Sequence, residues 1–253
     1  MSFGIAYAAP SWALCASDAR VTRPNGQTVD EEAGKVRRLP GGWCIGGTWT
    51  LLTAVLHDAL AEADLRRPVQ VVAALEACRP TVARMLKAVD TLHVGMLLED
   101  TNCGSFSQLA GGTARLFTVA ERPEGCFALR IYDPVTATLE TAVKTGGFCL
   151  SPAGVFDQEW LGERMARFGR DLTGVRPATL VEAVRLVGGF FQEVYELLGR
   201  LGGVGATVTC GVLARQPDGT VQAARLPLTR HGVLAQLSDE DLCGLLEPSP
   251  EPG

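Results

Sequence analysis

Three residues within the first 35 positions could do chemistry together: Ser2, Asp18 and Lys35. A small residue in second position permits removal of Met1, and that removal would expose Ser2 at the N-terminus. An N-terminal serine carries a hydroxyl group and a free α-amine whose pKa is about 8, so the amine accepts a proton at neutral pH. Such an amine can activate its own hydroxyl for attack on a carbonyl carbon.

Asp18 and Lys35 could tune this nucleophile. Asp18 ends one apolar stretch and Lys35 begins the next. A buried lysine held by a carboxylate would lower the pKa of the amine by like-charge repulsion and would stabilise developing negative charge. Solvent-exposed ion pairs among Asp18, Arg20 and Lys35 are the plain alternative, and the spacing leaves both interpretations open.

The composition bounds the class of protein. The chain has 253 residues, of which 47% are hydrophobic and 20% charged, so it is long enough and apolar enough to fold around a core. Its net charge of −5 gives no support for binding nucleic acid. No uncharged apolar stretch reaches the length of a membrane span, and no basic region precedes an apolar run at the N-terminus. We therefore expect no membrane association and a cytoplasmic location.

The metal-binding residue types are scattered. The eight cysteines include no C-x-x-C pair, and the three histidines are far apart in the sequence. Zinc sites and redox motifs need close spacing, so we expect no metal, no organic cofactor and mostly buried, reduced thiols.

Hydrophobic periodicity divides the chain into blocks of strands and pairs of helices. The pattern predicts strands at 3–8, 12–17, 35–39, 43–47, 92–98, 114–120, 126–132, 138–143, 206–214 and 220–226. It predicts helices at 51–63, 71–86, 156–168 and 179–198, with Pro80 as the start of a new segment inside the second.

Strand blocks interrupted by helix pairs favour two stacked, mainly antiparallel sheets whose outer faces are covered by helices. The predicted fold class is therefore α+β, a four-layer αββα sandwich. We expect one domain over 1–246 with a polar, glycine-rich loop insertion at 99–112. The proline-rich end, 247–253, is predicted to be disordered.

Four short runs resemble a proteasome β-type subunit, which is an N-terminal-nucleophile (Ntn) hydrolase. They are Ser-Phe-Gly-Ile-Ala-Tyr at 2–7, Leu-Cys-Ala-Ser-Asp-Ala-Arg-Val-Thr at 14–22, Gly-Lys-Val-Arg-Arg-Leu at 34–39 and Gly-Gly at 46–47. The lysine-containing run is especially similar to the bacterial proteasome-like peptidase, and the length is closer to the bacterial ancestral β-subunit group. The resemblance covers roughly the first fifty residues, and beyond them it extends to the order of elements.

The resemblance implies a role for each matching residue. Ser2 would be the nucleophile and its amine the base, while Asp18 would orient Lys35 and Lys35 would tune the amine and hydroxyl. Gly47 would offer a backbone N–H to the oxyanion, and Arg20 would buttress the site. Thr145, which precedes Gly146 and Gly147, would match a family serine that helps to handle the proton.

The chain departs from the family pattern at three places. Its nucleophile is serine where the family usually has threonine, and Thr48 and Trp49 follow Gly47 in place of a further glycine. The aspartate and serine that the family often places before Gly-Gly are absent, because Leu, Gly, Arg and Leu occupy 198–201.

The resemblance implies a peptidase that cleaves peptides or unfolded proteins inside a homo-oligomeric ring, and it leaves an ATPase partner open. Two alternatives stand beside it. One is a catalytically inactive Ntn-fold scaffold or binding protein, which the three departures would favour. The other is a small-molecule amidase with the same nucleophile.

Overall fold

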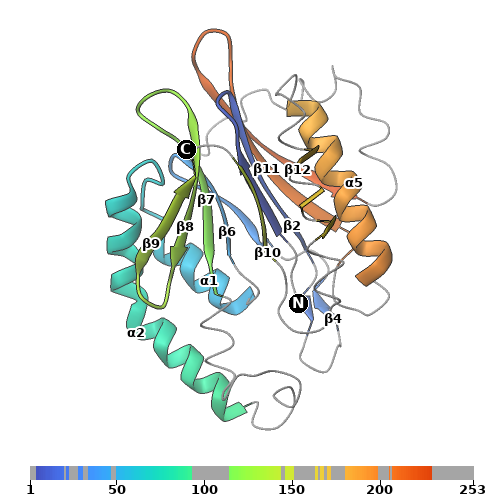
Figure 1. Cartoon of the computed structure of the whole chain (residues 1–253). Coiled ribbons are helices and arrows are strands. Elements are labelled where there is room, and N and C mark those ends of the chain that lie inside the picture. Colours follow the sequence, from blue (N-terminus) through green and yellow to red (C-terminus); the bar gives the residue numbers. More distant parts are fainter. Residues whose placement is uncertain are drawn as a thin grey trace.

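The computed structural model describes residues 4–19, 21–22, 28–30, 34–46, 50–92, 114–143, 146–150, 163–164, 166–167, 170–171, 180–198, 205 and 207–229. Within these ranges the chain forms two five-stranded antiparallel sheets, one small hairpin and three helices, which is a mixed α+β architecture (Figure 1). The sequence-based fold class is confirmed at this level.

The first sheet has the strand order β10-β1-β2-β11-β12. Its strands are β1 (Gly4–Ala8), β2 (Trp12–Asp18), β10 (Gly146–Leu150), β11 (Thr207–Arg215) and β12 (Val221–Thr229). β2 lies between β1 and β11, so the strand that ends at Asp18 is hydrogen-bonded on both sides.

The second sheet follows the chain in the order β5-β6-β7-β8-β9. Its strands are β5 (Val36–Leu39), β6 (Gly42–Gly46), β7 (Leu116–Glu121), β8 (Phe127–Asp133) and β9 (Thr138–Val143). The short hairpin of β3 (Val21–Thr22) and β4 (Thr28–Asp30) stands outside both sheets.

Alternation along the strands sends apolar side chains to both faces of each sheet. Ile5 and Tyr7 of β1 pack in one cluster with Val187 of α5 (Leu180–Leu198), whereas Ala6 and Ala8 belong to another. This second cluster joins the two sheets, because it also contains residues of β5, β6, β7, β8 and β11.

The other two helices cover the second sheet. Leu56 of α1 (Thr50–Ala59) and Leu75 of α2 (Pro68–Leu92) pack in a cluster with Leu116 of β7. Figure 1 shows α1 and α2 beside the strands of the second sheet and α5 on the opposite side of the molecule.

One side-chain hydrogen bond connects the two sheets directly. The indole Nε1 of Trp43 in β6 donates a hydrogen bond to the carbonyl oxygen of Val212 in β11, at 2.9 Å. The Trp43 ring lies where a side chain at position 211 would point: a Cβ on Gly211 would come within 2.4 Å of Trp43 Cδ2. Glycine at 211 is therefore what lets the sheets approach.

Two sequence-based expectations need correction. α2 does not begin a new segment at Pro80 but runs through it. Pro80 removes one backbone hydrogen bond, yet Val71 and Leu75 before it and Val82 and Leu86 after it are all buried, so packing keeps both halves helical.

The sequence pattern predicts no strand at 146–150, where the structure has β10. Its Gly-Gly start is typical of a turn, whereas pairing with β1 makes the segment a strand. The strand expected at 92–98 begins on a helical residue, because Leu92 is the last residue of α2, and 93–98 lie outside the described residues. The expected loop at 99–112, the tail at 247–253 and most of the helix at 156–168 lie outside them as well.

Candidate functional site

Asp18 and Lys35 form a buried ion pair. Lys35 Nζ donates a hydrogen bond to Asp18 Oδ2 at 3.2 Å, and the two side chains are 4% and 0% exposed. Burying two charges costs free energy that only their mutual attraction and further hydrogen bonds can offset. Of the two interpretations left open by the sequence, the buried pair is the one that the structure contains.

Backbone pairing positions this ion pair. Asp18 is the last residue of β2, and Lys35 directly precedes β5, so the pair connects the first sheet to the second. The register between Val36 and Ile45 puts Lys35 at the same end of the β5–β6 hairpin as Gly46. The register between Gly4 and Ser17 puts the beginning of β1 beside the end of β2.

The structure adds one residue that sequence reasoning missed as part of the site. The backbone N–H of Gly205 donates to Asp18 Oδ2 at 3.3 Å. By its pattern, the glycine-rich run at 202–205, which follows the predicted helix at 179–198, indicates only a helix stop and a tight entry into the next strand. Its position just before β11 was the available signal, since Val208 of β11 pairs with Asp18.

The Asp18 carboxylate therefore accepts two hydrogen bonds at one oxygen, from Lys35 and from Gly205. On the neighbouring residue, the Ser17 hydroxyl donates to the backbone carbonyl of Asp18 at 3.2 Å. These contacts hold the carboxylate in one orientation and direct the ammonium group of Lys35 toward the end of β2.

Four of the six predicted site residues, Ser2, Arg20, Gly47 and Thr145, lie outside the described residues. In the sequence, three of these four residues lie within two positions of described residues at the Asp18 end of the sheets. Ser2 is two positions before Gly4, Arg20 is two positions after Asp18, and Gly47 follows Gly46.

Thr145 has a different neighbour. Gly146, which follows it, pairs with Ala8 at the far end of β1. Gly4 and Ala8 are four residues apart, which is about 13 Å along a strand.

Gly46 has a packing reason for being glycine. A Cβ at this position would come within 2.3 Å of Thr53 Oγ1 on α1. At Gly46, the helix α1 therefore leaves no room for a side chain.

Metal ligands do not gather in the part of the chain that the structure describes: no group of three or more His, Cys, Asp or Glu residues has a suitable arrangement there. None of its helices is both long and apolar enough to cross a membrane. Neither a protein-family model nor a curated protein matches the sequence.

Proposed function

We propose that this protein is an N-terminal-nucleophile hydrolase that cleaves peptide bonds with Ser2 after removal of Met1. The observation that carries the proposal is the buried Asp18–Lys35 ion pair at the end of β2. A lysine that is 4% exposed is rare unless an ionic partner holds it there. Here it lies at the end of the sheet where the first strand begins.

Chain connectivity supports the role of Ser2. Its Cα is separated from that of Gly4 by two peptide units, so it lies within about 7.6 Å of Gly4. Gly4 pairs with Ser17, the residue before Asp18. In the proposed site the N-terminal amine lies beside the ammonium group of Lys35, whose positive charge would lower the pKa of that amine and favour its neutral, basic form.

In the proposed reaction, Ser2 Oγ attacks the carbonyl carbon of a peptide bond while the α-amine takes the hydroxyl proton. The proton then passes to the leaving amine as the C–N bond breaks, which leaves an ester on Ser2. Water hydrolyses that ester by the same route. Lys35 stabilises the developing negative charge, and the N–H of Gly47 would contribute to the oxyanion site.

The proposal includes the four-layer αββα arrangement. Three separate apolar clusters support it: one between α5 and the first sheet, one between the sheets, and one between the second sheet and the α1–α2 pair. Peptide substrates, a homo-oligomeric ring and a cytoplasmic location are proposed on the family resemblance alone.

The test is the intact mass of the purified protein with and without a peptide epoxyketone, which reacts with an N-terminal hydroxyl and its adjacent amine together. We expect loss of one methionine and a single adduct that is absent in Ser2→Ala. Ser11→Ala is the matched control, because Ser11 is an exposed serine in the turn between β1 and β2, and it should keep the adduct.

Retention of Met1 without an adduct would overturn the proposal and favour the inactive scaffold. If Met1 is lost and the adduct forms, the peptidase and the small-molecule amidase are still to be separated. The rates of hydrolysis of a panel of peptides and of a panel of small amides distinguish them. Hydrolysis of small amides but not of peptides would replace the peptidase by an amidase with the same nucleophile.

A further inference from the structure

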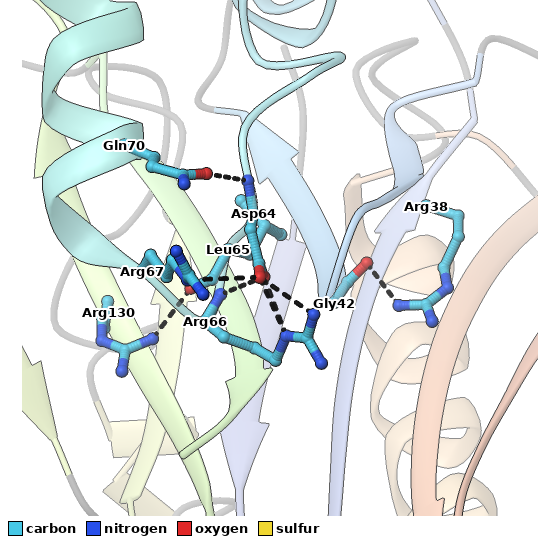
Figure 2. Close-up of polar contacts among 8 residues, drawn as sticks. All are labelled: Arg38, Gly42, Asp64, Leu65, Arg66, Arg67, Gln70 and Arg130. Atoms are coloured by element: carbon cyan, nitrogen blue, oxygen red, sulfur yellow. Dashed lines mark hydrogen bonds and ion pairs between the residues drawn. The ribbon is translucent and has the colours of Figure 1, made fainter. Parts of the chain in front are cut away.

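A second group of charges lies on the helix-covered face of the second sheet, toward the turn between β5 and β6. It consists of four arginines from three segments, which we call the arginine cluster: Arg66, Arg67, Arg122 and Arg130. Figure 2 shows Arg66, Arg67 and Arg130 around the segment that links α1 to α2. The turn end of β6 is Gly42, four residues from Gly46, so this cluster is separate from the Asp18–Lys35 site.

Asp64 neutralises only part of this charge. Its carboxylate accepts hydrogen bonds from Nε and Nη2 of Arg66, both at 2.9 Å, and Arg67 Nε lies 4.0 Å from it (Figure 2). Glu121 is already paired with Arg215, and Glu124 is exposed. Within the described part of the chain, Arg122 and Arg130 have no carboxylate at ion-pair distance.

Arg130 is the most buried member, at 5% exposed. An arginine has five N–H donors, and Arg130 uses one of them, from Nη1 to the carbonyl oxygen of Leu65 at 3.0 Å (Figure 2). Burial lowers the pKa of Arg130 and so does the charge of Arg122, while Tyr132 and Glu124 act in the opposite direction.

Arg122 is half-buried, and its Nε is fully buried without a hydrogen-bond partner among the described residues. Two buried hydroxyl groups lie beside Arg130. Thr118 pairs with Arg130 across β7 and β8, and Tyr132 is two positions further along β8. Both residues are 0% exposed. Burial raises the pKa of Tyr132 and the contact with Thr118 lowers it by a smaller amount, so the two hydroxyls lie near each other.

Buried guanidinium donors without partners carry a free-energy cost that native structures normally avoid. Two like charges near each other add to it. A doubly charged tetrahedral oxyanion would remove both costs, because it offers several acceptor oxygens and neutralises two guanidinium groups. Neutral water could satisfy the donors but would leave the charge of Arg122 and Arg130 uncompensated.

We propose that Arg122 and Arg130 bind an oxyanion of the phosphate class on the helix-covered face of the second sheet, beside Thr118, Tyr132 and the 60–67 segment. This site does not depend on the proposed hydrolase activity. The shared chemistry is the phosphate group, which could come from inorganic phosphate or from a phosphate monoester.

The test is calorimetric titration of the full chain with inorganic phosphate and, separately, with glycerol phosphate, in chloride buffer of matched ionic strength. We expect saturable binding of phosphate that weakens by about tenfold or more in Arg122→Gln. Arg122→Gln should fold, since the side chain makes no hydrogen bond with the described residues that its loss would break. Arg84→Gln is the matched control on α2, where Arg84 is exposed, and it should bind as the wild type does.

Binding of glycerol phosphate as well would extend the site to phosphate monoesters, whereas binding of inorganic phosphate alone would support a closed site for the free ion. Equal affinity in the wild type and Arg122→Gln would overturn the proposal, as would the absence of any phosphate-specific heat. A thermal-melting series gives an independent readout: phosphate should raise the Tm of the wild type and of Arg84→Gln more than that of Arg122→Gln.

Discussion

Lys35 Nζ lies 3.2 Å from Asp18 Oδ2, and this one contact joins the end of β2 in the first sheet to the beginning of β5 in the second. Both side chains are almost fully buried. The pair is therefore a structural link between the sheets as well as the centre of the proposed site.

We predict that Lys35→Met lowers the free energy of unfolding by about 3–5 kcal/mol, because it leaves the Asp18 carboxylate buried without its cation. The double variant Asp18→Asn/Lys35→Met should recover most of that loss, since no charge stays buried. Urea unfolding of the two variants and the wild type measures both effects. Equal stability of the single and double variants would contradict a coupled pair.

The same variants separate stability from chemistry. If Lys35 tunes the amine of Ser2, the double variant should fold and still fail to react with the epoxyketone. Labelling of a folded double variant at the wild-type rate would mean that the pair has only a structural role.

Gly211→Ala should destabilise the protein by about 1–3 kcal/mol, because the added methyl group overlaps the ring of Trp43 and must push the sheets apart. Gly189→Ala in α5 is the matched control: a Cβ there meets nothing within 4 Å. That substitution should stabilise by about 0.5–1 kcal/mol through helix propensity. Thermal unfolding of the two variants tests the opposite signs.

His57 should make the protein sensitive to acid. Burial, aided by the charge of Arg37 and opposed by Asp58, lowers the pKa of His57 from 6.5 to about 4. The unfolded chain therefore binds a proton at His57 more readily than the folded chain does. Stability from this group is complete above pH 6.5 and is lost as the pH falls toward 4, by about 3 kcal/mol in total.

The comparison for this effect is His57→Leu, which removes the titrating group and also a buried Nε2 without a hydrogen-bond partner in the described structure. Its stability should be equal to or above that of the wild type at pH 7.5 and should fall less between pH 6.5 and 4. Parallel pH profiles for the two proteins would show that His57 is not responsible.

Three cysteines, Cys15, Cys44 and Cys210, should resist alkylation in the folded protein. They are fully buried free thiols, and burial raises the pKa of Cys210 to about 12 and raises those of the other two as well. The reactive thiolate is therefore scarce at pH 8. Peptide mapping after iodoacetamide treatment should find them unmodified until urea is added, whereas the half-buried Cys126 should be modified before them.

Much of the fold could be predicted from local pattern. The β5–β6 hairpin follows from two short apolar runs around Pro40 and Gly41, and the position of α5 follows from its helical periodicity. Prediction failed where tertiary contacts outweigh local preference. α2 passes through Pro80 because both halves pack on the same sheet, and β10 is a strand because β1 pairs with it.

For the candidate site, the sequence by itself determined which residue types are available: a serine that can become N-terminal, and an aspartate and a lysine at the ends of apolar runs. Only the tertiary structure decided that Asp18 and Lys35 meet in the interior, and that Gly205 donates to the same carboxylate. Antiparallel pairing brings residues 187 positions apart within hydrogen-bond distance. Local sequence carries no record of such a pairing, because its free energy comes from the burial of whole sheets.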